Sequence, residues 1–584
     1  MPGMSRAERR RKERQSAAAP VPSAAPARWL QIATFALAAV CLLGLFSTQV
    51  ADTDFWWHLK TGEYLAQQHK LPVPDPFAYT TPSAAAYPGE ERVRHFNLTH
   101  EWLSQLLIYS VYAAAGFGGI VLMRALLLAM VCGLAGWLAA RLSGQFYAGV
   151  AAAGAAASVM ASFAADRPGV VSFLGVAVLV CLLEMRRGWW ALPLLMLLWA
   201  NCHGGFVLGW VVLAAYCVEE LLQQRDRRLF LWAALAIVAS GINPNGFGVL
   251  PTILSYRHSP LTASLIEWQP PRLWGEPYGF DVLLYTAAAV LILSWRKVRP
   301  AHWLLFAAFA AASLAAFRNT ALIGFLAPVL IAAYFPWHLR MPSAMAWAAP
   351  VVAAVALIAG LANGRFFQFG VADWTLPRGA ADFLAGHGIA GPIFNTYEQG
   401  GYLIWRLWPD ARVFIDGRSL SESVYRDYRQ ILYNEGSVAD QVTGPREELL
   451  ERYGVQAVVM NAMDYVSGTL YPMALALANP TGTEWQLVYD DAQAVVFLKN
   501  PPPAIPPLSN KLGRMLRHMD RECESYIAAA PDYPLCARTL ARYWTSNQAP
   551  DEARRMLTLY LEHAPRDAEA AQMLRNLDSA PLKK

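Results

Sequence analysis

The feature that most constrains this chain is a series of apolar stretches between residues 29 and 362. An apolar run of about 17 to 22 residues matches the thickness of a bilayer core, and about eleven such runs are expected here. The predicted spans are 29–49, 119–140, 145–163, 168–186, 189–201, 206–222, 228–243, 279–296, 301–316, 319–335 and 344–362. Hydrophobic residues form 55% of the chain, so we expect an α-helical polytopic membrane protein with a smaller soluble part.

Positive charge predicts the orientation of these spans. The basic segment 6–14 precedes the first span, and further Lys and Arg fall on the same side at 141, 186–187, 225–228, 296–299 and 340. Because cytoplasmic loops are enriched in Lys and Arg, we expect a cytoplasmic tail over 1–28, in a bacterial inner membrane. This anchoring also explains the basic segment without a nucleic-acid partner. The orientation requires that Thr99–Gly116 lies on the membrane surface as an interfacial helix.

Two carboxylates follow the first span, at the start of the predicted outer loop 50–118. Asp52 and Asp54 lie beside aromatic residues and His58. A carboxylate at the edge of the hydrocarbon region is usually paired, liganded or reactive, so this cluster is an active-site candidate. The alternative is that the acids end a helix at the interface, with the tryptophans as belt residues.

Other charged residues are predicted to lie at the same membrane face. They are Asp166 and Arg167 in a turn, Glu267 in the loop 244–278, and Arg318 at the start of a span. Carboxylates suit hard divalent ions, so Asp54, Asp166 and Glu267 predict a Mg²⁺ or Mn²⁺ site. Arg318 is a candidate phosphate ligand. Each residue alone is also explained as a solvated loop charge.

Four segments resemble motifs of the GT-C glycosyltransferases, which use polyprenyl-phosphate sugars, and especially of the catalytic subunit of oligosaccharyltransferase. Asp54–His58 is similar to a first-loop Asp-Pro-Tyr-Tyr-His pattern, and His258–Pro270 is similar to a Ser-Val-Ser-Glu-His-Gln-Pro motif. Arg318–Pro328 is similar to an Arg-x-Met-Leu run. Tyr397–Ile404, with Arg412 and Asp416–Arg418, is similar to the start of the outer domain of that family. The resemblance covers most of residues 30–420.

The resemblance implies metal-assisted, inverting transfer of a sugar. Asp54, with Asp52 beside it, would activate the acceptor, while Asp54, Glu267 and Asp166 would hold the ion. Arg318 would stabilise the phosphate leaving group. The expected substrate contacts besides Arg318 are Arg167, His58, His203, Glu398 and Arg418. For His203 a hydrogen-bonded helix end is an equal alternative, and for Asp416–Arg418 an ordinary turn.

Two positions depart from the pattern of that family. Tyr397–Gln399 stands where the family has Trp-Trp-Asp, which grips the acceptor Ser or Thr, so an Asn-x-Ser/Thr acceptor is not implied. Asp166 precedes Arg167, whereas the acid of the family follows its Arg-x-x-Gly turn.

Residues 363–500 are predicted to form a small outward-facing α/β domain, periplasmic or extracellular. Strands are expected at 392–394, 412–415, 457–460, 486–489 and 494–498, with helices near 380–386 and 446–453. A stiff Pro-rich linker, 501–515, leads to 516–584, which resembles a tetratricopeptide helix pair. This pair is expected to dock on the α/β domain or on a protein partner. Cys523 and Cys536 are the only pair suited to a disulfide.

The predicted function is transfer of a sugar or glycan from a polyprenyl-(di)phosphate donor to an acceptor at the outer face of the membrane. The partners are thus the lipid-linked donor and the bilayer. One alternative is a non-catalytic GT-C-like scaffold that recruits envelope-assembly partners through the soluble and tetratricopeptide-like parts. A transporter is disfavoured because the predicted spans lack the interior acids that ion coupling needs.

Overall fold

Apolar helices fill the chain from residue 28 to residue 362 in the computed structural model, which describes 28–579 apart from 84, 225, 257–258, 260–264, 275–278, 337–342, 419, 435–444 and 482. The helices are α2 (Arg28–Phe46), α5 (Trp102–Ser143), α6 (Phe146–Met160), α7 (Gly169–Met185), α8 (Leu192–Cys202), α9 (Val207–Gln223), α10 (Arg228–Ser240), α11 (Val249–Tyr256), α13 (Phe280–Leu293), α14 (Pro300–Ala315), α15 (Thr320–Tyr334) and α16 (Ser343–Ala362). Short 3₁₀ turns join them at Ala161–Phe163, Trp189–Ala191, Gly204–Phe206, Ile266–Trp268 and Phe317–Asn319.

These helices have the properties of membrane spans. Five helical stretches are long and apolar enough to cross a bilayer, and shorter apolar helices of 10–17 residues accompany them. Along α5, Leu122, Leu126 and Met130 repeat every fourth residue and are exposed, as expected for a face that contacts lipid. Every predicted span falls on one of these helices. The multi-pass membrane class is confirmed, whereas the number of crossings and their orientation stay predictions.

A break in α5 separates its first turns from its membrane-length part. Gly116 has φ 60° and ψ −156°, a conformation that only glycine adopts without strain. The helix before the break is the segment predicted to lie on the membrane surface, and the helix after it is a predicted span. Gly116 therefore marks the junction between the two parts, while the placement of the first part on the membrane surface stays a prediction.

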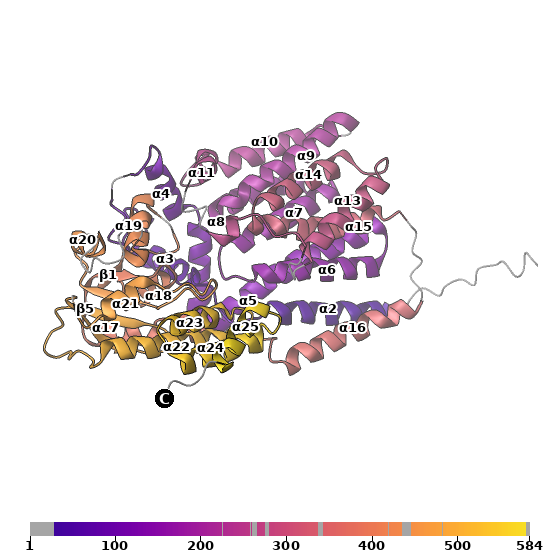
Figure 1. Cartoon of the computed structure of the whole chain (residues 1–584). Coiled ribbons are helices and arrows are strands. Elements are labelled where there is room, and N and C mark those ends of the chain that lie inside the picture. Colours follow the sequence, from indigo (N-terminus) through magenta and orange to yellow (C-terminus); the bar gives the residue numbers. More distant parts are fainter. Residues whose placement is uncertain are drawn as a thin grey trace, which may run out of the picture.

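A five-stranded mixed sheet forms the centre of the soluble part (Figure 1). Its elements are α17 (Arg378–Gly386), β1 (Gly391–Asn395), α18 (Tyr397–Leu407), β2 (Ala411–Val413), α19 (Glu422–Tyr433), α20 (Pro445–Arg452), β3 (Ala457–Met460), α21 (Pro472–Ala478), β4 (Trp485–Asp490) and β5 (Val495–Lys499), after a 3₁₀ turn at Asp373–Thr375. The strand order is β2-β1-β3-β5-β4, with β1 parallel to β2 and β3, and β5 antiparallel to β3 and β4. Each predicted strand overlaps an observed one.

The first outer loop is part of this sheet unit. It contains α3 (Phe55–Gln68) and α4 (Glu90–Thr99), which lie beside the sheet in Figure 1. Ala78 pairs in parallel with Val413, so the loop extends the sheet beyond β2. Aromatic residues of the loop, such as Phe55 and Phe77, share one hydrophobic core with the strands. The loop and the sheet therefore fold as a single unit, although the sequence places them in separate regions.

The C-terminal segment consists of α22 (Lys511–Ala529), α23 (Leu535–Ser546), α24 (Pro550–His563) and α25 (Ala568–Ser579). The sequence predicted only a pair of helices, because α22 begins inside the stretch interpreted as a linker. Met515, Met519 and Cys523 repeat every fourth residue and form the buried face of α22.

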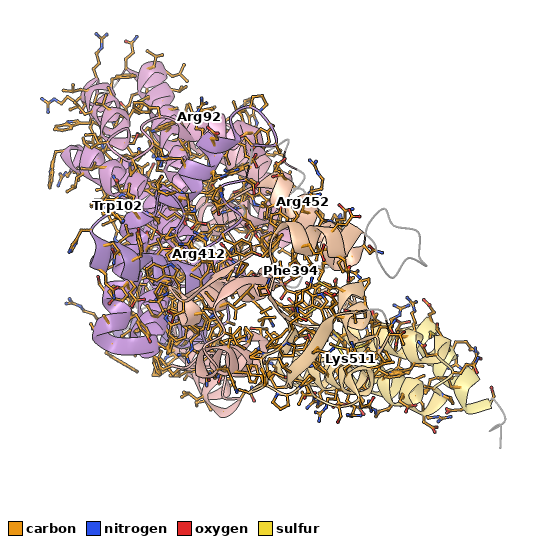
Figure 2. The ribbon with its side chains drawn as sticks, turned by 90° about the vertical axis from the view of Figure 1, so that its left-hand side faces the viewer. Arg92, Trp102, Phe394, Arg412, Arg452 and Lys511 are labelled. Atoms are coloured by element: carbon orange, nitrogen blue, oxygen red, sulfur yellow. A yellow bond between two sulfur atoms is a disulfide. The ribbon has the colours of Figure 1, made fainter. Side chains whose placement is uncertain are left out.

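The C-terminal helices dock on the sheet unit. The carboxylate of Glu522 accepts a hydrogen bond from the amide of Ala462, which follows β3. In Figure 2 the segment that begins at Lys511 projects from the sheet unit, on the side away from the labelled Trp102 at the start of α5. The predicted disulfide between Cys523 and Cys536 is present and joins α22 to α23.

Candidate active site

Three carboxylates converge on the guanidinium of Arg167, which lies in the turn before α7. Nη2 of Arg167 is 2.9 Å from Oδ1 of Asp52, and Nε also donates to this carboxylate. Nη1 is 3.2 Å from Oδ2 of Asp54 and 3.4 Å from Oε2 of Glu267. The structure therefore brings together four of the predicted site residues, contributed by three separate loops. We call these four residues, Asp52, Asp54, Arg167 and Glu267, the Arg167 cluster.

Asp54 is held in place from several sides. It lies directly before the first turn of α3, where the helix dipole favours a negative charge. Its Oδ1 accepts a hydrogen bond of 3.2 Å from the indole of Trp57, three residues later on the same helix. The backbone of Gly417 lies against the same oxygen. Burial raises the pKa of Asp54 to about 6, although the charge of Arg167 acts in the opposite direction.

Glu267 connects Arg167 to Arg318. Its Oε1 is 3.2 Å from Nη1 of Arg318, while its Oε2 faces Arg167. The guanidinium of Arg318 also lies 4.7 Å from the ring centre of Trp268. About a third of each of the Arg318 and Glu267 side chains remains exposed. No described residue accepts a hydrogen bond from Nε or Nη2 of Arg318, so these groups can donate to a ligand.

Asp166 belongs to a different ion pair. Its Oδ2 is 2.5 Å from Nη1 of Arg124, which comes from the membrane-length part of α5, and both side chains are buried. Arg124 also donates to the backbone oxygens of Phe46, the last residue of α2, and of Thr48, two residues later. Burial raises the pKa of Asp166 to about 7 despite the nearby Arg124. This pair fastens the turn that carries Arg167 to the helix bundle.

The three predicted metal ligands do not form a shared ion site in this arrangement. Asp54 and Glu267 point at Arg167, and Asp166 points at Arg124. Over the residues that the structure describes, no group of three His, Cys, Asp or Glu side chains is arranged to hold a metal. The donor set therefore does not fit a divalent ion in this arrangement, and the Mg²⁺ or Mn²⁺ expectation stays an untested prediction.

His58 and His203 lie in a neighbouring buried cluster around Glu101. The Glu101 carboxylate is 3.7 Å from Nδ1 of His58, 3.4 Å from Nε2 of His100 and 3.6 Å from Nε2 of His203. Nδ1 of His203 also lies 2.6 Å from the hydroxyl of Ser172. Burial lowers the pKa of His58 to about 4 and that of His203 to about 3, so both are neutral at neutral pH. Within the described part of the chain, neither histidine makes a hydrogen bond or an ion pair with Arg167 or with the carboxylates of Asp52, Asp54 and Glu267.

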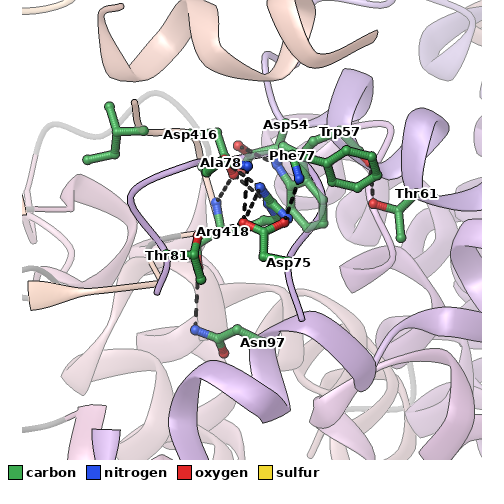
Figure 3. Close-up of polar contacts among 12 residues, drawn as sticks. Asp54, Trp57, Thr61, Asp75, Phe77, Ala78, Thr81, Asn97, Asp416 and Arg418 are labelled. Carbon is green, nitrogen blue, oxygen red and sulfur yellow. Dashed lines mark hydrogen bonds and ion pairs between the residues drawn. The ribbon is translucent and has the colours of Figure 1, made fainter. Parts of the chain in front are cut away.

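Arg418 joins the first outer loop to the soluble part. Its Nη1 is 2.7 Å from Oδ1 of Asp75, and its Nε is 2.7 Å from Oδ1 of Asp416. All three side chains are almost fully buried, and Figure 3 shows the guanidinium of Arg418 with the carboxylates of Asp75 and Asp416. The Arg418 side chain is therefore engaged by protein carboxylates, directly after Gly417, whose backbone lies against Asp54.

Glu398 lies at the first turn of α18, away from the Arg167 cluster. Its Oε1 accepts a hydrogen bond of 3.2 Å from the hydroxyl of Tyr471. Burial raises the pKa of Glu398 to about 7, and the charge of Asp464 adds to this effect. The structure brings Glu398 into contact with no other predicted site residue within the described chain.

The sequence interpretation missed three residues that shape the site. Arg124 carried a usable signal, because a lone charge inside an apolar span is rarely accidental. Glu101 was assigned only to the charged start of an interfacial helix, and Asp75 carried no signal, since an acid between two prolines is typical of any loop.

The helices, the sheet and the acidic loops together define a class, the multi-pass membrane proteins with an α/β part beside their acidic loops. Among solved structures, the chain is similar to the archaeal oligosaccharyltransferase AglB from Archaeoglobus fulgidus in complex with an inhibitory peptide and a dolichol-phosphate. The TM-score is 0.51 with 11% identity, over 95% of this chain and 87% of that chain. No family model and no curated protein matches the sequence. The likeness confirms the predicted resemblance at the level of the fold.

Proposed function

We propose that this protein is a membrane glycosyltransferase that moves a sugar or glycan from a polyprenyl-phosphate or polyprenyl-diphosphate donor to an acceptor at the outer face of a bacterial inner membrane. The observation that carries the proposal is the cluster of Asp54, Glu267 and Arg318, in a chain whose fold is similar over 95% of its length to an oligosaccharyltransferase. That relative is complexed with a lipid phosphate, which supports the same class of donor here.

The geometry suggests a division of roles in the reaction. Asp54 accepts the proton of the acceptor as the acceptor attacks the anomeric carbon, since its raised pKa favours proton uptake near neutral pH. The bond between that carbon and the phosphate oxygen breaks, and the phosphate leaves with the negative charge. Arg318 stabilises this charge, because it is partly exposed and has donors that no described residue uses.

The disulfide of the C-terminal helices supports the proposed orientation. Disulfides persist in oxidising compartments such as the bacterial periplasm and are rare in the cytosol. Cys523 and Cys536 lie in helices that dock on the sheet unit, and that unit forms one wall of the site. The disulfide therefore supports placing the C-terminal part and the Arg167 cluster on the outer side, as the distribution of basic residues also does.

The discriminating experiment measures binding of a short-chain polyprenyl-phosphate sugar to the purified full-length protein in detergent. A guanidinium presents two parallel donors to a phosphate and lysine only one charge, so Arg318→Lys should weaken binding at least about tenfold, and Arg318→Ala further. Arg412→Lys is the matched control, since Arg412 is exposed on β2. Unchanged affinity in both Arg318 variants would refute the role of Arg318 and favour the scaffold alternative.

A second measurement separates donor binding from chemistry. Asp54→Asn keeps the size of the side chain but removes the proton acceptor, so transfer should be lost while donor affinity stays within about twofold of the wild type. Transfer at the normal rate in this variant would remove Asp54 from the mechanism.

A further inference from the structure

We infer that Arg167 supplies, from within the protein, the positive charge that gathers the reacting carboxylates, so that the site holds no divalent ion. The inference rests on the proposed function for its catalytic meaning. The observation behind it is that the guanidinium of Arg167 lies where Asp52, Asp54 and Glu267 converge.

The contacts of Arg167 account for most of its donors. A guanidinium has five N–H groups in a planar fork. In this structure Nε and Nη2 donate to the two oxygens of Asp52, and Nη1 faces both Asp54 and Glu267. Arg167 therefore organises the carboxylates, whereas Arg318 keeps free donors for a phosphate.

The position of Arg167 is fixed by the backbone around it. Pro168 follows it directly, before the first turn of α7, and the carbonyl of Arg167 accepts a hydrogen bond of 3.3 Å from the amide of Val170. The preceding residue, Asp166, is buried against Arg124. The turn that carries Arg167 is therefore anchored to the helix bundle.

Charge balance disfavours an additional divalent ion. Asp52, Asp54 and Glu267 carry up to three negative charges, which Arg167 and Arg318 reduce to one. An ion between Asp54 and Glu267 would use the oxygens that already face Nη1 of Arg167, and the two cations would repel each other at close range. The remaining negative charge is what Asp54 needs to accept a proton.

The test is a titration of the purified full-length protein with Mn²⁺, followed by electron paramagnetic resonance, which requires no activity. The wild type should bind no stoichiometric Mn²⁺ at micromolar concentrations. Arg167→Gln should expose the three carboxylates and gain one Mn²⁺ site, and Arg167→Gln with Asp54→Asn should lose it again. Arg318→Gln is the matched control and should gain no site, because Arg318 contacts only Glu267 among these carboxylates.

Several results would overturn the inference. One is a wild-type protein that binds one Mn²⁺ and loses it on Asp54→Asn or Glu267→Gln. Another is a folded Arg167→Gln variant that gains no site. The wild-type titration decides the question even if Arg167→Gln does not fold. Stoichiometric Mn²⁺ in the wild type together with normal transfer would leave the proposed function standing, whereas failed donor binding with no Mn²⁺ in the wild type would refute only the proposed function.

Discussion

Replacing Gly417 by alanine tests whether the soluble part of the chain forms a wall of the site. A Cβ atom at this position would lie 1.8 Å from Oδ1 of Asp54 and 3.1 Å from the indole nitrogen of Trp57. Real Cβ atoms essentially never approach other atoms closer than 3.0 Å. Either Asp54 or the turn that carries Gly417 must therefore move by roughly 1 Å, a scale at which catalytic geometry is lost.

The free-energy cost of moving either the Gly417 turn or the Asp54 side chain can be estimated. Forcing a methyl group into a packed contact costs about 1–3 kcal/mol. If Asp54 rotates instead, it loses the hydrogen bond from Trp57, and bonds to a charged group contribute about 1.5–3 kcal/mol. A displacement of about 1 Å at a reacting group lowers the rate about 10²-fold. We thus expect Gly417→Ala to lose about 2 kcal/mol of stability at this interface and most of its transfer activity.

The assay combines two measurements on purified protein. Hydrogen exchange should be faster over residues 54–60 and 414–418, where the two segments meet, and sugar transfer should fall. Gly386→Ala is the control, because a Cβ atom there would meet nothing within 4 Å. If Gly417→Ala exchanges and transfers like the wild type, the soluble part does not close over Asp54 as described.

Three further predictions follow from other contacts. Transfer should rise with pH through about 6, because burial raises the pKa of Asp54 to about 6 and only the ionised carboxylate accepts a proton; a pH profile of kcat/KM checks this. Arg124→Met should lower stability by about 3–5 kcal/mol, measured by thermal unfolding, since Asp166 would be left buried and unpaired. Replacing Cys523 and Cys536 by serine should cost about 2–4 kcal/mol, seen as faster proteolysis of α22 and α23.

Each of these predictions has its own contradicting result. A pH profile that is flat between 5 and 7 in the wild type would remove Asp54 as the proton acceptor. In the Arg124→Met background, Asp166→Asn should recover part of the lost stability, and no recovery would mean that the ion pair is not the cause. Proteolysis of the serine variant that spreads to the sheet unit would contradict a local effect of the disulfide.

The helices and strands were largely predictable because their signals are local. In α5, an apolar run of membrane length predicts the span, and Gly116 stands at the break that precedes it. The wholly apolar run 457–460 corresponds to β3, whose residues are all buried. The union of the first outer loop with the sheet was not predictable, since Ala78 and Val413 meet only through tertiary packing.

The candidate site was predictable in its acids and less so in their partner. Asp54 and Glu267 were expected to meet, and they do meet at one cation. A carboxylate in a loop looks the same in sequence whether it binds a metal ion or a guanidinium. The carboxylates were therefore predicted to bind a metal ion, and Arg167 was predicted to contact the substrate. Asp166 was assigned to the same group because its partner, Arg124, lies 42 residues earlier and was interpreted only as part of a span.

The pairing of the first outer loop with β2 also has a consequence for biosynthesis. The hydroxyl of Thr80 donates to the carbonyl of Phe414, 334 residues later in the chain. At a synthesis rate of about 5–20 residues per second, the loop waits roughly 17 to 67 s before its partner strand has been made. During that interval Phe77 and the other aromatic residues of the loop have no sheet to cover them. The loop that follows the first helix can therefore complete its folding only late in synthesis, after its partner strand has been made.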